Sequence, residues 1–390
     1  MKNLTLRYTI TQILYWAGSA GASSYATAYL LEKGFPAWSV GFMLAVGGLL
    51  SSVSQPLLAS FADRSRKFIL PEMLLFLSAL SAACFGVQLL PDIPLYFLGS
   101  CYIIAIWCTN TMLPLINALN LAYTQVGYTI NYGAARGIGA VATATSTLFF
   151  GFIIARWGTD SMFCCLMGFR ILSIIVFCRF PKIGKASASA ESVRSDCSIF
   201  TFFSRYKWYC VSLIGILFLG MYHAMTENYM IVIMERLGGN SSHVGIALFI
   251  SAMVTFPVIF FFGKIQSRLR NTTLLKIAAV SFLTKAVLFC FANSIETIYV
   301  LQLLQITSYA FLEPTQVYYA NAKVAPSDMV KGQAFITAAY ALGCSAGNFA
   351  GGQLLSLGVD AILTAGVVMA LAGTFVIFST VAKSDIEKVR

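Results

Sequence analysis

Charged residues are scarce in this 390-residue chain. Asp, Glu, Lys and Arg together make up 11% of it, whereas soluble domains carry about 25%. Hydrophobic residues make up 58% of the chain and aromatic residues 14%. A soluble protein could not bury so much apolar surface, because much of any folded surface stays in contact with water. The composition therefore excludes a water-soluble enzyme, a nucleic-acid-binding module and a disordered chain, and it indicates a polytopic membrane protein.

Motifs for catalysis and for ATP-driven pumping are also missing. The chain has no GxxxxGK[ST] sequence, so it contains no nucleotide-binding loop. It has only two histidines and no HExxH sequence, which excludes the common metalloprotease site. Its ten cysteines form no CxxC pair, and we interpret them as small packing residues. We expect a protein that is not an enzyme, with no cofactor and no metal site, and an ion gradient as its energy source.

Twelve apolar stretches are long enough to cross a bilayer, which takes about 20 residues. The first stretch lacks the shape of a signal peptide and has no cleavage site, so we expect it to remain as the first helix. The twelve fall at roughly 8–31, 39–62, 68–89, 95–120, 133–155, 160–180, 208–234, 242–262, 272–293, 297–322, 333–356 and 360–382.

Basic residues are unevenly divided between the two sides of these spans. Twenty of the 26 Lys and Arg residues lie at the termini and in the even-numbered loops, and three lie on the opposite side. Because basic residues are retained on the cytoplasmic side, we predict cytoplasmic termini and a place in the inner or plasma membrane. The net charge of +11 then reflects topology and contact with anionic lipid, so we expect no nucleic-acid partner. We expect the protein to act as a monomer.

A polar stretch near the middle separates six spans from the next six. Its sequence, PKIGKASASAESVRSDCS at 181–198, is typical of a flexible linker. The Gly-containing turn LEKGFPAWSVG after the first span corresponds to MERLGGNSSHVG after the seventh. We predict an N-terminal six-helix bundle at 1–180, a cytoplasmic linker at 181–206 and a C-terminal six-helix bundle at 207–390, which is the parallel-repeat pattern of membrane transporters.

Three glycines in the eleventh predicted span are spaced four residues apart. Gly343, Gly347 and Gly351 would form a smooth stripe along one side of a helix. The stripe predicts close contact with a neighbouring backbone, and it would also suit helices that slide during a conformational change.

Few ionisable residues lie inside the predicted spans. A charge within the bilayer is costly unless it faces a cavity or a partner, so each one is a functional candidate. The alternative for any of them is an ion pair that only orders the bundle. Arg170 fits that alternative best, because no polar residue accompanies it on its face. The ionisable residues in question are Arg136, Arg170, His223, Glu227, Lys285 and Glu313.

Glu313 is our candidate for the residue that carries a proton. It precedes Pro314, which must disturb the helix and leave backbone carbonyls without donors. A carboxyl group in such a dry, irregular place could take up a proton near neutral pH. Lys285 could pair with its ionised form. His223 and Glu227 share one helix face, and we expect them, with Lys285, to adjust the proton affinity.

Amide, phenol and guanidinium groups elsewhere in the spans suit a cavity that binds a small polar solute. The alternative is that these groups bond to one another across helices. The candidates for substrate binding are Arg136, Asn117, Asn120, Tyr25, Tyr29, Asn228, Gln316 and Asn348.

The segment PLLASFADRSRK after the second predicted span is similar to the loop motif G-x-x-x-D-R-x-G-R-R of the major facilitator superfamily. Asp63, Arg64 and Lys67 match the motif, whereas Ala59 replaces the leading Gly and the inner Gly is missing. The resemblance extends over nearly the whole chain. It implies an all-α integral membrane fold of twelve helices, in two six-helix bundles related by a pseudo-twofold axis. It also implies that Asp63, Arg64 and Lys67 form a conformational switch on the cytoplasmic side.

Two further segments resemble the branch of that superfamily that holds lactose permease, nucleoside/proton symporters and phenylpropionate permease-like proteins. LPLINALN and NYGAARGIGA are similar to the helices whose carboxylate and Arg bind substrate. Arg136 matches that Arg, and Asn117 stands at the carboxylate position. AFLEPTQVYYANAK is similar to the segment with the proton-coupling Glu. Glu313 matches that Glu, and Lys285 stands where the family has an Arg.

This resemblance implies a proton-coupled symporter that takes up a small polar organic solute by alternating access. Its partners would be H⁺, membrane lipid and a sugar or glycoside, a nucleoside or an aromatic carboxylate, with Na⁺ open as the coupling ion. One alternative is efflux of amphipathic compounds. The drug/proton antiporters of the superfamily carry a Gly-Pro motif in the fifth helix, however, and this chain has no proline between Pro114 and Pro181. The other alternative is a membrane sensor that binds ligand without transporting it.

Overall fold

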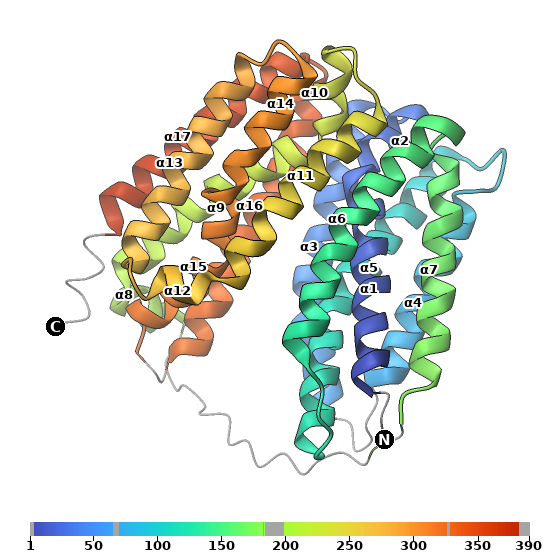
Figure 1. Cartoon of the computed structure of the whole chain (residues 1–390), viewed down its shortest axis with the longest axis horizontal. Coiled ribbons are helices and arrows are strands. Elements are labelled where there is room, and N and C mark those ends of the chain that lie inside the picture. Colours follow the sequence, from blue (N-terminus) through green and yellow to red (C-terminus); the bar gives the residue numbers. More distant parts are fainter. Residues whose placement is uncertain (1–3, 65–69, 182, 184–198, 326–327, 382–390) are drawn as a thin grey trace. The chain divides into compact units, whose positions relative to one another are not determined.

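A computed structural model describes residues 4–64, 70–181, 183, 199–325 and 328–381 (Figure 1). Every regular element within these ranges is a helix. Ten of the described helical segments are long and apolar enough to cross a membrane. The chain is therefore an all-α, multi-pass membrane protein, as its composition predicts.

The chain divides into two compact units. Unit 1 consists of residues 1–189 with 230–252, and unit 2 consists of residues 190–229 with 253–390. The predicted division into six-helix bundles at 1–180 and 207–390, joined by a linker at 181–206, stays a prediction.

In unit 1, α1 packs against α5, α6 and α7, while α5 also packs against α3 and α4. Buried Tyr8, Leu74, Met112, Leu119 and Phe177 belong to the apolar core of this unit. Its helices are α1 (Leu4–Ser24), α2 (Ala26–Glu32), α3 (Ala37–Arg64), α4 (Leu70–Val87), α5 (Leu95–Gln125), α6 (Tyr132–Trp157) and α7 (Asp160–Cys178).

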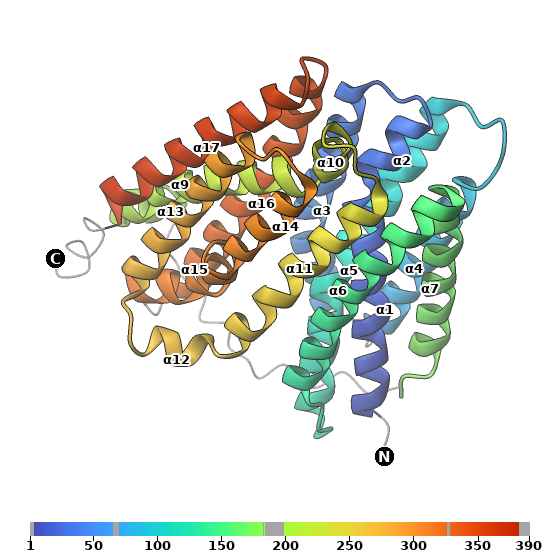
Figure 2. The ribbon, with the colours of Figure 1, turned by 45° about the horizontal axis from the view of Figure 1, so that its top comes forward.

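In unit 2, α9 lies against α16 and α17, and α13 lies against α15 and α17 (Figure 2). α10 and the first part of α11 belong to unit 1. The remaining helices of the described chain are α8 (Ile199–Arg205), α9 (Lys207–Glu227), α10 (Met230–Arg236), α11 (Ser241–Phe260), α12 (Phe262–Gln266), α13 (Asn271–Cys290), α14 (Ile295–Gln302), the 3₁₀ helix η1 (Leu303–Ile306), α15 (Tyr309–Lys323), α16 (Met329–Leu355) and α17 (Val359–Thr380).

Two of the twelve predicted spans are not among the ten apolar helices. They are 8–31, which corresponds to α1 and α2, and 333–356, which corresponds to α16. Both contain many small and polar residues. Both also pack extensively within their units, α1 against α6 and α16 against α9. The two segments of low hydropathy are therefore segments that pack extensively against other helices.

The glycine stripe on α16 makes the close backbone contact that its spacing predicts. Gly343 and Gly347 face the backbone of Leu217 and Met221 on α9, so that a Cβ atom at either position would overlap a carbonyl group. Residues 343–347 also have the G-x-S-x-G spacing of hydrolases. They lie inside a helix and not at a strand-to-helix turn, which excludes a nucleophile elbow.

Two helices, α1 and α9, are broken in the same way. Each is 21 residues long, and each is followed after a break by a helix of seven residues, α2 or α10. The break falls at Tyr25 in one case and at Asn228–Tyr229 in the other. The Tyr25 hydroxyl donates to Thr147 O at 2.5 Å, and the Tyr229 hydroxyl donates to Asn348 O at 2.6 Å.

The turns after α2 and α10 also have the same geometry. Gly34 and Gly238 both adopt a positive φ, 86° and 78°, which favours glycine. The Gly34 amide donates to Leu31 O and the Gly238 amide donates to Glu235 O, each at 3.0 Å. The correspondence predicted between these turns is confirmed at the level of single hydrogen bonds.

The predicted span 297–322 is interrupted, but not where the sequence predicts. Pro314 lies inside α15, whereas the irregular stretch runs from Leu303 to Ser308, before α15 begins. Pro314 lacks the amide hydrogen that would bond to the carbonyl four residues earlier, which weakens the start of α15. Within this irregular stretch, the Ser308 hydroxyl donates a hydrogen bond to Leu304 O at 2.9 Å. The expected disturbance is therefore displaced toward the N-terminus by more than one turn.

Candidate functional site

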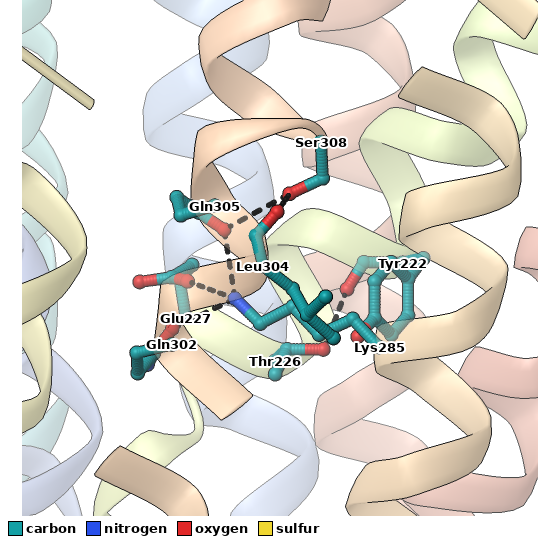
Figure 3. Close-up of polar contacts among 8 residues, drawn as sticks. All are labelled: Tyr222, Thr226, Glu227, Lys285, Gln302, Leu304, Gln305 and Ser308. Atoms are coloured by element: carbon teal, nitrogen blue, oxygen red, sulfur yellow. Dashed lines mark hydrogen bonds and ion pairs between the residues drawn. The ribbon is translucent and has the colours of Figure 1, made fainter. Parts of the chain in front are cut away.

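A buried ammonium group is the centre of the polar site in unit 2 (Figure 3). Lys285 on α13 is 2% exposed. Its Nζ donates to Gln302 Oε1 and to Gln305 Oε1, both at 2.8 Å. Its third contact is an ion pair with Glu227 Oε1 at 3.4 Å. An ammonium group has three donors, so these three acceptors satisfy it.

The interruption in the helix explains why both amides reach the same atom. Gln302 ends α14 and Gln305 lies in η1. In a 3₁₀ helix residues three apart eclipse one another, so both side chains point toward Lys285. The Gln305 oxygen also accepts from the Ser308 hydroxyl at 3.3 Å. The irregular backbone therefore supplies most of the acceptors around the cation.

Glu227 contributes the negative charge of this site. It is the last residue of α9, and its side chain is 17% exposed. Gln302, in contrast, is fully buried, and its Nε2 atom has no hydrogen-bond partner. The site thus combines one carboxylate that water can reach with an amide donor left unused.

The pairing of Lys285 with Glu313 expected from the sequence is wrong, because the ion pair of Lys285 is with Glu227. Glu313 lies on α15, partly buried, and interacts electrostatically with Tyr340. The sequence could not distinguish the two carboxylates, because the choice depends on how the interrupted helix turns. Gln302 and Gln305 were missed altogether, although two amides three residues apart beside a buried Lys could have marked them.

His223 lies one turn before Glu227 on α9, as predicted, and is surrounded by aromatic rings. Its ring stacks on Tyr309 with centroids 4.8 Å apart and an interplanar angle of 5°. Phe282 meets it edge-on at 6.0 Å, and Tyr340 lies tilted at 6.3 Å. Glu313 interacts electrostatically with Tyr340 and Glu227 with His223, so each carboxylate acts on one ring of this aromatic cluster.

Two predicted substrate residues, Asn228 and Asn348, come together in unit 2. Asn228, in the break after α9, donates through Nδ2 to Oδ1 of Asn348 on α16 at 2.7 Å. This contact fits the alternative in which polar groups bond across helices. Gln316 is buried on α15, where it is 8% exposed.

In unit 1, Arg136 belongs to a chain of polar contacts along α1. Its guanidinium lies 4.2 Å from the centre of the Trp16 ring. Trp16 Nε1 donates to Gln12 Oε1 at 2.9 Å, and Gln12 Nε2 donates to the Tyr8 hydroxyl at the same distance. Tyr8, Gln12 and Trp16 are four residues apart, so they share one face of the helix.

Asn117 joins this cluster from α5. The Tyr132 hydroxyl donates to Asn117 Oδ1 at 3.5 Å, and the Tyr132 ring lies 6.3 Å from the Tyr8 ring. Arg136 and Asn117, predicted together, are thus linked through two tyrosines. Asn120, the third predicted residue here, has a buried Oδ1 atom without a hydrogen-bond partner.

The structure does not place Tyr25 and Tyr29 in this cluster. Both are fully buried, and both hydroxyls already have partners, Thr147 O and Gln88 Oε1. The Tyr29 ring also packs against Phe163 at 4.3 Å. Both hydroxyls are used in contacts within unit 1, and their role as substrate ligands stays a prediction. The sequence showed two tyrosines one turn apart but not which way they face.

Arg170 on α7 is the second deeply buried cation, with 1% exposure. Its guanidinium donates to Thr109 Oγ1 at 2.7 Å and to Met112 Sδ at 3.5 Å. The Phe85 ring centre is 6.0 Å away, and the Nε atom has no hydrogen-bond partner. Its described hydrogen bonds are all to neutral groups, which differs from the expected structural ion pair.

The predicted switch residues lie at the edge of the described chain. Asp63 and Arg64 end α3, but their side chains and the whole of Lys67 fall outside the described residues. Their role stays a prediction.

Comparison with known proteins identifies the family. The sequence profile described as the MFS_1 like family matches residues 5–363. The chain belongs to the MFS_1-like family. Members of the MFS_1-like family have the major facilitator fold, so the predicted fold class and superfamily are confirmed, and the chain is a secondary transporter and not an enzyme. No curated protein sequence matches the chain.

Solved structures support the same fold. The nucleoside transporter NupG is 15% identical, with a TM-score of 0.84 over 97% of this chain and 98% of its own. A POT family transporter in complex with a thioalcohol-conjugated peptide is 12% identical, with a TM-score of 0.73 over 98% and 96%. A bacterial homologue of the human lysosomal transporter Spinster is 13% identical, with a TM-score of 0.67 over 99% and 96%. At these identities the likeness shows the fold alone.

Proposed function

We propose that this MFS_1-like protein is a proton-coupled symporter that takes up a small polar organic solute by alternating access. In this proposal α1 with α2, and α16, are the two spans beyond the ten apolar helices, giving twelve. Both termini are cytoplasmic, and the protein acts as a monomer in the inner or plasma membrane. The observation that carries the proposal is the buried Lys285 held by one carboxylate and two amides.

Protonation of Glu227 is the proposed coupling step. Glu227 supplies the negative charge beside Lys285, so a neutral Glu227 would leave the ammonium with neutral acceptors alone. Those amides belong to α14 and η1, on the interrupted helix. Releasing the cation from Glu227 would therefore change the forces on an irregular segment that can adjust its backbone. This links proton uptake to a conformational step.

Glu313 is the second proposed proton-carrying residue, and His223 adjusts both. The His223 ring is stacked on Tyr309 and close to Tyr340, with which Glu313 interacts, and Glu227 acts electrostatically on His223. A charge on either carboxylate therefore acts on the same aromatic cluster. We retain Lys285 as the group that sets the proton affinity of Glu227.

Arg136 and Asn117, with Asn120, form the proposed substrate-binding part of unit 1, and Asn228, Gln316 and Asn348 form that of unit 2. The cluster around Arg136 combines a cation, aromatic rings and amides. It suits a ring-bearing polar solute, and we propose a sugar or glycoside, a nucleoside or an aromatic carboxylate. NupG is named a nucleoside transporter. That name adds weight to the nucleoside among the three.

The test is solute uptake into proteoliposomes under an imposed pH gradient. A panel of sugars, nucleosides and aromatic acids is first screened for stabilisation of the purified protein, because a ligand of the native state raises its melting temperature. The solute that binds is then supplied with and without the gradient. Wild-type protein is expected to accumulate it only when the outside is acidic. Accumulation driven by the opposite gradient would overturn uptake in favour of efflux.

The coupling residue is tested by Glu227→Gln, which keeps the shape of the side chain but cannot be protonated. We expect it to exchange solute across the membrane yet fail to accumulate it. Glu235→Gln on α10 makes the same chemical change at an exposed position and is expected to behave as wild type. Glu313→Gln is compared in the same assay. Full accumulation by both the Glu227 and Glu313 variants would contradict the proposed proton sites.

A further inference from the structure

A basic pocket lies in unit 2, away from the buried Lys285 site. Its volume is about 370 Å³, and it is lined by residues 266–272 together with Ala322 and Lys323. Three of these nine residues, Arg268, Arg270 and Lys323, are basic, and none is acidic. The proposed transport mechanism uses none of them.

One of the three cations is held inside the protein. Lys323 is 5% exposed and is the last residue of α15. Its Nζ atom lies 5.7 Å from the centre of the Tyr319 ring. A charge facing a cavity from a buried position interacts more strongly with an anion than one in open water, because screening by solvent is weaker.

The beginning of α13 adds neutral donors to the same pocket. The hydrogen bonds of this helix begin with the Thr273 and Leu274 amides, both donating to Arg270 O. The amides of Asn271 and Thr272 therefore precede the first intrahelical bonds, at the positive end of a 20-residue helix. Both residues line the pocket.

Side-chain hydrogen bonds hold the walls of the pocket together. Gln266 Nε2 donates to Asn271 Oδ1 at 3.3 Å, which joins α12 to α13. Asn271 Nδ2 donates to Tyr318 O at 3.1 Å, which joins α13 to α15. Arg268 and Arg270 lie in the connection between α12 and α13, and Lys323 ends α15, so these bonds tie together the helices next to the basic residues.

We propose that this pocket binds a phosphate group. Two guanidinium groups, a buried ammonium and helix N-terminal amides together suit a tetrahedral oxyanion with several acceptor oxygens. The phosphate could belong to the headgroup of an anionic phospholipid or to a free phosphate ion. Phe260 and Phe261, which precede α12, are 69% and 49% exposed, and such aromatic side chains favour the membrane interface. The predicted topology places this end of the helices on the cytoplasmic side.

The experiment measures thermal stability of the purified full-length protein with two probes. One probe is phosphatidylglycerol added to detergent micelles, with phosphatidylcholine for comparison, and the other is inorganic phosphate, with chloride at equal ionic strength. The tested variant is Arg268→Gln/Arg270→Gln. The control, Arg156→Gln/Arg236→Gln, removes the same charge from two exposed positions outside the pocket. We expect the tested variant to bind the anion about 30-fold more weakly, as the loss of two cations implies.

Each outcome has a definite meaning. Stabilisation by phosphatidylglycerol that the pocket variant loses and the control keeps supports the proposal with lipid as the source. The same pattern with inorganic phosphate supports it with a free ion as the source. No stabilisation by either probe, or equal loss in both variants, overturns it. If the pocket variant does not fold, Lys323→Gln replaces it, and native mass spectrometry of wild-type protein counts bound phosphatidylglycerol directly.

Discussion

Among the described residues, the two most deeply buried cations are satisfied in opposite ways. Arg170 in unit 1 donates to a hydroxyl and a thioether, Thr109 and Met112. Lys285 in unit 2 donates to two amides and forms an ion pair with Glu227. Their exposures are nearly equal, 1% and 2%. Burial alone therefore does not distinguish a structural charge from a functional one.

The difference lies in whether a partner can change its charge. A hydroxyl and a thioether stay neutral at every physiological pH, so the surroundings of Arg170 are fixed. Glu227 can gain a proton, and its side chain is partly open to water. In the proposed mechanism, one of these two buried cations orders helices and the other responds to a proton gradient.

Among the variants that test this comparison, Lys285→Met is expected to have the largest effect. Removing the cation leaves Glu227 without its charge partner, and breaking a buried pair in this way costs about 3–5 kcal/mol. We expect the unfolding free energy in detergent, measured by denaturant titration, to fall by about that amount. Accumulation of solute should be lost.

The control for this effect is Lys285→Met/Glu227→Gln, in which neither charge remains. We expect it to regain most of the lost stability but not accumulation, because the unpaired carboxylate is gone while coupling is still absent. If the double variant is no more stable than Lys285→Met, the ion pair between Lys285 and Glu227 does not contribute to the free energy of unfolding.

A smaller effect is expected for Arg170→Met. Loss of the hydrogen bond to Thr109 is offset by removal of a buried charge, so stability should change by less than about 2 kcal/mol. Solute should still accumulate against its gradient. Loss of accumulation in a variant that stays folded, as judged by circular dichroism, would give Arg170 a functional role and end the distinction drawn here.

The smallest effects are expected for Tyr25→Phe and Tyr229→Phe. Each removes one hydrogen bond from a hydroxyl to a backbone carbonyl, Thr147 O or Asn348 O. Each should cost about 1 kcal/mol. The two costs should be equal within error, because the helix breaks have the same geometry. A large difference between them would show that one break is under a constraint that the other lacks.

The sequence predicts much of the fold because membrane spans depend on composition and length. The apolar stretches, the superfamily and the matching turns at Gly34 and Gly238 were all readable from residue patterns. Close packing of α16 on α9 followed from the spacing of Gly343 and Gly347. These features depend on local chemistry, which a single sequence contains.

The site is less predictable because it depends on tertiary geometry. Arg136 and Asn117 lie in one cluster of unit 1, and His223 and Glu227 share a helix, while the roles of all four stay predictions. The partner of Lys285 was wrong because the helix is interrupted at Leu303–Ser308 and not at Pro314. The role of Tyr25 and Tyr29 stays a prediction, because a polar side chain inside a span can face either a cavity or a neighbouring helix.

The broken helices also bear on how the protein matches its bilayer. The 21 residues of α1 and the 7 of α2 would extend about 42 Å if continuous, at about 1.5 Å per residue. The hydrocarbon core is only about 30 Å thick. A rigid helix of that length would have to tilt steeply or deform the lipid around it. Because the break at Tyr25 divides this length, α1 alone extends about 32 Å, close to the thickness of the hydrocarbon core, and α9 has the same length.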